Sequence, residues 1–241
     1  MLNLLNNNDM STLKELLEGF KPEFKSELDN YELDNECFRG IAEAFLYGGY
    51  ISVYDAEGER YRIFIRTVEF YCHREGDEKV LPKDPIVYHR NGRYVEGEVP
   101  YFPLMSFHAH ASGIDITFEN KNELLRSSAL IRAYEVYDMK REKYLRYDTT
   151  KQLFVSCNDS EDRVNKQSTY LYDFLNGFGS NNIVWKDTPI PEQHQALKPA
   201  QRRNVYIYKY DDAKRDWIKL PTRDVREWSF TRLDEIERIP D

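Results

Sequence analysis

The segment from residue 63 to residue 135 constrains the fold most strongly, because its apolar residues alternate as β-strands require. It contains the runs IFIRTVEFYCH, FHAHASGIDITF and LIRAYE, separated by loop-forming sequence. Two of these runs carry a carboxylate between apolar neighbours, Glu69 in the first and Asp115 in the second. A buried charge is costly unless it is paired or used. Four of the five histidines also lie in this segment: His73, His89, His108 and His110. This concentration predicts a functional site.

The remaining pattern predicts one α+β domain with a small N-terminal helical part. A T-x-x-E capping box begins at Thr12, and apolar residues at helical spacing predict helices over 12–20 and 35–47. Residues 168–178 have helical spacing as well, and Asn176-Gly177 would end that helix. Strands are predicted over 50–54, 61–71, 107–118 (interrupted at Gly113), 128–137, 205–210, 217–220 and 227–231.

The expected domain organisation follows from these elements. We expect a disordered leader over residues 1–10 and a single domain over 11–241, with its helices concentrated in 11–48. Residues 82–103 contain four prolines and two glycines and are predicted to form a long loop. The strands before and after this loop would then form a hairpin-connected β-body.

Charge and cysteine content narrow the classes of function. The net charge of −8 and pI of about 5.3 are atypical of a non-specific nucleic-acid binder, because phosphate affinity comes largely from Lys and Arg. The three cysteines form no CxxC motif, which favours a reducing cytoplasm. No apolar run approaches membrane-spanning length, so no membrane partner is expected. One candidate basic face, more simply interpreted as a solvated surface, comprises Lys198, Arg202, Arg203, Lys209, Lys214 and Arg215.

Residues two apart on a strand face the same way, so Glu69, Tyr71 and His73 should share one face. A polar, solvent-exposed face of an edge strand would explain the same pattern. Cys72 would point to the opposite face, where it is interpreted as a buried structural thiol rather than a nucleophile.

His108 and His110 also share a face, and a His-x-His pair on a strand can bind a metal ion with an added acid. This spacing is weak evidence, because surface histidine pairs are common. A metal-dependent protein that uses this pair therefore remains one alternative.

Four ordered motifs resemble the alkyladenine (methylpurine) DNA glycosylase family. They are IRTVEFY at 65–71, YHR at 88–90, IDIT at 114–117 and LIRAYE at 130–135, and the segment that they span is about a third of the chain. The family has corresponding strands of the types I-V-E-T-E-A-Y, M-N-I-S and L-L-R-A-x-E-P. The resemblance implies a curved, mostly antiparallel β-sheet with peripheral helices, acting as a monomer on double-stranded DNA without a cofactor or metal.

The resemblance also implies residue roles. Glu69 would activate a water molecule for attack on the sugar, and Arg132 would lie beside that water. Tyr71 and His89 would hold a purine flipped out of the duplex. Asp115 and His108 complete the expected base-binding residues, although Asp115 stands where the family has asparagine. Phe107 or His108 would occupy the region from which the family inserts an aromatic wedge into DNA.

Two further alternatives stay open at the level of sequence. A relative with altered catalysis could use the acidic site to bind a small molecule or a protein. Glu69 and Arg132 could also form a purely structural ion pair between neighbouring strands, with Asp115 paired to Arg90 or Arg126.

Overall fold

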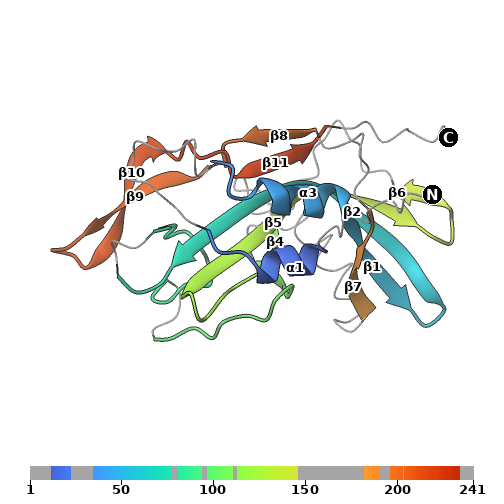
Figure 1. Ribbon diagram of the computed structural model, residues 1–241, viewed down its shortest axis with the longest axis horizontal. Helices are drawn as coiled ribbons and strands as arrows, with labels where there is room; N and C mark the ends of the chain where they lie inside the picture. Colours follow the sequence, from blue (N-terminus) through green and yellow to red (C-terminus); the bar gives the residue numbers. More distant parts are fainter. Residues whose placement is uncertain are drawn as a thin grey trace, which may run out of the picture.

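A curled antiparallel sheet of nine strands organises the protein (Figure 1). The computed structural model describes residues 12–22, 35–77, 81–93, 97–110, 113–145, 182–189, 196–202 and 204–233. All strand pairings in these residues are antiparallel, and the path through the sheet is β3-β4-β5-β2-β1-β7. The nine strands are β1 (Gly49–Asp55), β2 (Gly58–Arg74), β3 (Phe107–His110), β4 (Gly113–Thr117), β5 (Leu125–Asp138), β6 (Lys143–Leu145), β7 (Ile183–Asp187), β8 (Leu197–Ala200) and β11 (Ser229–Arg232).

The long strand β2 is the centre of this sheet. It pairs with β5 along almost its whole length, from Tyr61 opposite Asp138 to Arg74 opposite Leu125. On its other side, β1 pairs with its first half and β11 with its second half. The register with β5 shifts on either side of Thr67. Such bulges bend a strand and increase its twist, which accounts for the curl of the sheet.

Two helices cover one face of the sheet, where the main apolar core lies. They are α1 (Leu13–Glu18) and α3 (Arg39–Tyr47), so the predicted N-terminal helices are confirmed but shorter. The Thr12 capping box is present, since Thr12 and Glu15 each bond the other's backbone N–H. From β2, the ring of Phe70 stacks on Phe38 with centroids 4.6 Å apart. Val68, Phe70 and Cys72 of β2 thus point toward the apolar core, and the intervening Glu69, Tyr71 and His73 toward the opposite face.

The region predicted as one interrupted strand over 107–118 is instead a hairpin of β3 and β4. Phe107 pairs with Ile116, and His110 with Gly113. The chain reverses between His110 and Gly113, so the alternating pattern continues on a second strand rather than along the first. The single-strand prediction was therefore wrong, and the reversal brings His108 directly opposite Asp115.

The described parts of residues 75–106, named here the cover segment, cross the polar face of the sheet. The described parts of this segment contain no helix or strand, which confirms the predicted loop. The backbone N–H of Asp84 donates to Nδ1 of His73 on β2, at 3.1 Å. Nη1 of Arg126 on β5 donates to the carbonyl of Pro100, at 3.0 Å. The polar face is therefore buried under the cover segment rather than exposed to solvent.

A separate two-stranded hairpin, named here the β-ribbon, spans residues 206–223. It consists of β9 (Tyr206–Asp211) and β10 (Asp216–Arg223), and Figure 1 shows it extending from one end of the molecule. No helix in the described part of the chain is long and apolar enough to cross a membrane. The predicted leader over 1–10 and the predicted helix over 168–178 lie outside the described residues.

Candidate functional site

One cross-strand row on the polar face collects the predicted site residues. Glu69 on β2 lies opposite Leu130 on β5, which lies opposite Asp115 on β4, which lies opposite His108 on β3. Directly opposed residues in a sheet point to the same face. Arg132 lies two residues along β5 from Leu130, so it shares this face as well.

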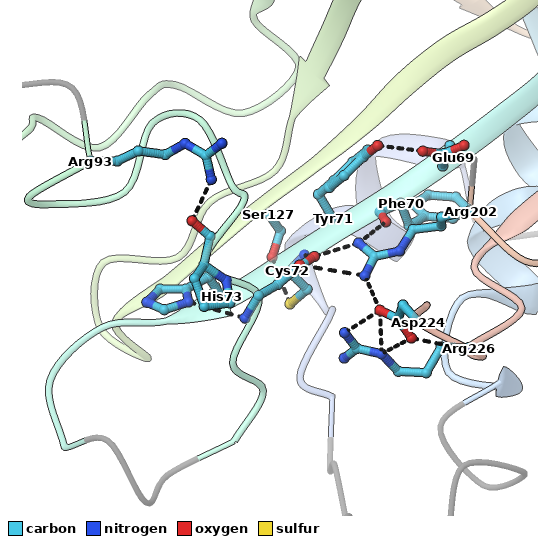
Figure 2. Close-up of polar contacts among 12 residues, drawn as sticks. Glu69, Phe70, Tyr71, Cys72, His73, Arg93, Ser127, Arg202, Asp224 and Arg226 are labelled. Atoms are coloured by element: carbon cyan, nitrogen blue, oxygen red, sulfur yellow. Dashed lines mark hydrogen bonds and ion pairs between the residues drawn. The ribbon is translucent and has the colours of Figure 1, made fainter. Parts of the chain in front are cut away.

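Within this row, Glu69 is the acceptor of a compact hydrogen-bonded cluster. Arg132 donates from Nε to Oε2 of Glu69 at 3.0 Å and from Nη2 to Oε1 at 2.7 Å. The hydroxyl of Tyr71 donates to Oε1 of Glu69 and lies 3.3 Å from Nη2 of Arg132. Figure 2 shows the Tyr71 hydroxyl directed at the Glu69 carboxylate. The predicted general base, its arginine and its tyrosine are thus in mutual contact.

This cluster is removed from solvent. The exposed fraction is 1% for Glu69 and 7% for Arg132. Burial, followed by the charge of Glu69, raises the pKa of Tyr71 well above its ordinary value. The Tyr71 hydroxyl is therefore protonated at neutral pH and donates a hydrogen bond to Glu69. Burial alone would lower the pKa of Arg132, but Tyr71 and Glu69 together raise it, so Arg132 stays charged. The geometry is that of a carboxylate held in a fixed orientation by two donors.

The predicted shared face of β2 is confirmed, but its explanation as an exposed edge strand is wrong. β2 is central in the sheet, and His73 is buried together with Glu69. Burial, followed by the charges of Lys83 and other cations, lowers the pKa of His73 to about 2. His73 is therefore neutral, and its Nδ1 accepts the Asp84 N–H.

Cys72 lies on the opposite face of β2, as predicted. It is a free, buried thiol whose Sγ is 3.2 Å from Oγ of Ser127. Burial raises the pKa of Cys72 to about 12. A thiolate is the nucleophilic form of cysteine, so the geometry favours the structural interpretation over the nucleophile.

His89 lies in the cover segment, where its imidazole belongs to an aromatic cluster. Its exposed fraction is 3%, and its ring centroid is 5.5 Å from that of Phe102 and 5.7 Å from that of Tyr88. The Phe102 ring in turn contacts His108, with centroids 3.6 Å apart. Phe102 thus links the two histidines for which the motif resemblance implies base binding. Nδ1 of His89 touches a carboxylate oxygen of Glu119, but the two atoms are not aligned as a hydrogen bond.

Asp115 is buried beside the same aromatic cluster. Burial, followed by the negative charge of Asp115, raises the pKa of Tyr88. The carboxylate of Asp115 therefore lies close enough to Tyr88, the neighbour of His89, to act on it electrostatically. Asp115 and His108 form one end of the cross-strand row, and Glu69 with Arg132 forms the other.

Sequence reasoning missed a second buried cluster, centred on Arg202. The interpretation as a solvated basic face was wrong for this residue, whose exposed fraction is only 2%. Arg202 donates to Asp84 in the cover segment, to Asp224 at 2.5 Å and to the carbonyl of Phe70 at 3.2 Å. Its guanidinium also lies over the ring of Tyr71, with Cζ 4.9 Å from the centroid. Figure 2 shows Arg202 between Phe70 and Asp224.

Asp224 connects this cluster to the segment that precedes β11. Arg226 donates from Nε to both Asp224 oxygens at 3.0 Å and from Nη2 to Oδ2 at 2.6 Å. Both Arg202 and Arg226 lie over the indole of Trp228, at 4.8 Å and 4.0 Å from Cζ to the centroid. Burial would raise the pKa of Asp224, but the charges of Arg202 and Arg226 lower it below its ordinary value. The alternating D-x-R-x-W pattern at 224–228 was the available sequence signal.

Arg126 forms the centre of a third cluster and anchors the cover segment. Its side chain is fully buried and donates to Glu75 and Glu119, each at 3.1 Å. These two glutamates, and not Asp115, are therefore its acidic partners. Arg126 also binds groups of the cover segment: the side-chain oxygen of Asn91, the carbonyls of Val99 and Pro100, and the ring of Tyr101.

A metal site from the His108 and His110 pair gains no support. No group of three or more His, Cys, Asp or Glu residues in the described ranges is arranged to hold a metal ion. The structure does not describe the side chain of His110.

Comparison with known proteins gives no assignment. No protein-family model matches the chain, and no curated protein matches it significantly.

Proposed function

We propose that this protein is a glycosylase-like hydrolase that cleaves the N-glycosidic bond of a damaged purine in double-stranded DNA. The observation that carries the proposal is the buried Glu69–Arg132–Tyr71 cluster, in one cross-strand row with Asp115 and His108. These are the positions to which the motif resemblance assigns catalysis and base binding.

The proposed chemistry needs a single carboxylate. Glu69 accepts a proton from a water molecule as the water oxygen bonds to the sugar C1′. The bond between C1′ and the base nitrogen breaks, and its electron pair leaves with the base. The sugar passes through an oxocarbenium-like state, which the negative charge of Glu69 stabilises. Arg132 positions the carboxylate through two hydrogen bonds and remains protonated throughout.

The base-binding role falls on the aromatic and acidic side chains. A base taken out of the duplex is held by aromatic faces and by hydrogen bonds to its edge. Tyr71, His89 and His108 supply the rings, and Asp115 supplies hydrogen-bond acceptors. An ionised carboxylate only accepts, so Asp115 favours a base that presents an N–H group, unlike an asparagine, which also donates.

A second candidate is a binding module on the same fold, without catalysis. The observation that favours it is that Arg132 and Tyr71 already bind both oxygens of the Glu69 carboxylate. These bonds use three of the roughly four lone-pair sites of the carboxylate. A general base would have to bind its water at the remaining site or after one donor has moved, whereas a structural ion pair needs neither.

The deciding experiment is cleavage of duplex oligonucleotides that carry hypoxanthine or ethenoadenine. Wild type is expected to form abasic sites, and Glu69→Gln is expected to form none. Asp138→Asn is the matched control, because Asp138 is a buried acid bound to Arg60 at the far end of the β2–β5 pair. This control shows whether removing the charge of a buried acid that binds an arginine abolishes activity when the acid lies away from the site.

The outcomes separate the two candidates. Abasic sites formed by wild type and Asp138→Asn, but not by Glu69→Gln, support the hydrolase. Equal activity in Glu69→Gln would overturn the role of Glu69. No product from wild type at enzyme excess, on either lesion, would overturn the hydrolase and favour the binding module.

A further inference from the structure

The β-ribbon is a basic element on an acidic protein. The whole chain has a net charge of −8, but residues 206–223 contain five cations and three acids. All five cations are exposed. They are Lys209, Lys214, Arg215, Lys219 and Arg223. The β-ribbon therefore presents a positive surface where the chain as a whole would repel a polyanion.

The acids of the β-ribbon do not neutralise these cations by direct pairing. Oδ1 of Asp211 accepts the backbone N–H groups of Ala213 and Lys214, at 3.0 Å and 3.2 Å, and so stabilises the turn. Asp216 accepts the N–H of Trp217 at 2.7 Å. Within the described ranges, the side chains of Lys209, Lys214 and Arg215 form no ion pair.

One face of the β-ribbon carries both aromatic and cationic side chains. Trp217 lies opposite Tyr210, with ring centroids 5.4 Å apart, at the end near the turn. At the other end, Nζ of Lys219 is 3.7 Å from the ring centroid of Tyr206, and Arg223 lies opposite the same tyrosine. Exposed cations of this kind bind phosphate oxygens, and the aromatic rings hold Lys219 and Arg223 at defined positions on the surface.

The β-ribbon also adjoins the candidate site. The ring of Trp217 packs edge-on against His73, with centroids 6.5 Å apart. His73 is on the same face of β2 as Tyr71 and Glu69, two and four residues away. A polymer bound along the β-ribbon would therefore lie beside the polar face that holds the proposed catalytic residues.

We propose that the β-ribbon binds the sugar–phosphate backbone of duplex DNA next to the candidate site. This inference rests on the proposed function and names its docking surface. Cations that bind phosphates release counterions, so they contribute affinity and salt dependence without base specificity. Two-stranded ribbons also fit the grooves of duplex DNA.

The test is binding of an undamaged, fluorescein-labelled duplex, followed by anisotropy from about 50 to 200 mM NaCl. The variant Lys209→Ala/Lys214→Ala/Arg215→Ala removes three exposed cations from the β-ribbon. The matched control removes three exposed cations elsewhere, which form surface ion pairs: Lys14, Lys21 and Lys140, each changed to alanine. Both triple variants shift the net charge equally, from −8 to −11.

The β-ribbon variant is expected to bind at least about tenfold more weakly at low salt. Its plot of log Kd against log salt should flatten by about 0.9 for each phosphate that the variant no longer neutralises. The control should bind nearly as tightly as wild type. Equal weakening of binding in the two variants would overturn the proposal that the β-ribbon is the DNA-binding surface. Tighter binding of wild type to anionic lipid vesicles or to RNA than to the duplex would also overturn it.

These results are separable from the fate of the hydrolase. Binding that depends on the β-ribbon, together with no cleavage by wild type, would uphold the docking surface and overturn the chemistry. Cleavage that depends on Glu69, together with unchanged binding by the β-ribbon variant, would overturn the docking surface and uphold the chemistry.

Discussion

Arg202 should be among the most costly residues to replace, because it neutralises two buried carboxylates in segments far apart in sequence. In Arg202→Met, Asp84 loses its only ionic partner among the described residues and keeps the Cys72 N–H at 3.4 Å. Asp224 is better protected, since Arg226 still donates to both of its oxygens. The variant therefore leaves one buried carboxylate, that of Asp84, without a compensating charge.

The magnitude follows from that count. Removing one partner of a buried ion pair costs about 3–5 kcal/mol. The whole free energy of unfolding of a protein is only about 5–15 kcal/mol. For a chain of this size, each kcal/mol lowers the melting temperature by roughly 2–4 °C, so Arg202→Met should melt about 6–20 °C below wild type.

Urea unfolding followed by tryptophan fluorescence measures this directly, because Trp228 is buried against Arg202. Arg226→Met is the matched control. It removes the other arginine from Asp224, but Arg202 remains bound at 2.5 Å, so a smaller loss on the order of 1–2 kcal/mol is expected. Adding Asp84→Asn to Arg202→Met should recover part of the loss, because the uncompensated charge is then gone.

Two results would refute this reasoning. One is an unfolding free energy for Arg202→Met within about 1 kcal/mol of wild type, which is the range of an exposed pair. The other is a double variant whose loss equals the sum of the two single losses, since that would mean that Arg202 and Asp84 do not interact.

Two further predictions concern titration and reactivity. The arginines beside Asp224 hold the pKa of its carboxyl group in the folded state below the unfolded value of about 3.9. Ionised Asp224 therefore stabilises the fold fully above the unfolded pKa, and this stabilisation is lost as pH falls through the folded pKa. The stability difference between wild type and Asp224→Asn should therefore shrink from about pH 6 to pH 3 in urea titrations, and a constant difference would contradict the assignment. Because burial raises the pKa of Cys72 to about 12, iodoacetamide at about pH 8 should leave Cys72 unmodified in the native protein while it labels the partly exposed Cys37. Peptide mass spectrometry with and without urea measures both sites, and equal native labelling would show that Cys72 is accessible.

Local periodicity predicted the parts of the fold that depend on neighbours in sequence. The alternation in β2 correctly assigned Glu69 and Tyr71 to one face and Cys72 to the other. The capping box at Thr12 correctly marked the start of α1. The contact of Glu69 with Arg132 was also anticipated, as an alternative to catalysis, and the two residues are indeed ion-paired.

Long-range pairing could not be read from the same pattern. Arg202 is 118 residues from Asp84 and 132 from Phe70, and an arginine in a polar run carries no local sign that it will be buried. The hairpin of β3 and β4 was missed for a related reason, because a strand that continues and a strand that reverses show the same alternation. Only the pairing register decides between them.

The distribution of buried charge bears on whether the Glu69 cluster is structural or functional. Replacing buried ion pairs by apolar residues is often neutral or stabilising, so a sheet does not need such pairs to fold. Arg126 and Arg202 have a structural role, because each ties the cover segment to the sheet. The pair of Glu69 and Arg132 instead joins β2 to β5, two strands that backbone pairing already holds together along almost their whole length.

The Glu69–Arg132 pair therefore adds the cost of desolvating two charges between strands that backbone hydrogen bonds already hold together. Arg60 and Asp138 also join β2 to β5, but the Arg60 side chain is partly exposed and so loses less hydration. The Glu69 pair is therefore the ion pair that the architecture explains least, and the motif resemblance locates catalysis there. On these grounds we propose a functional role for this pair. The comparison of Glu69→Gln with Asp138→Asn tests that explanation directly, because Asp138 bonds Arg60 within the same pair of strands but away from the polar face that holds the site.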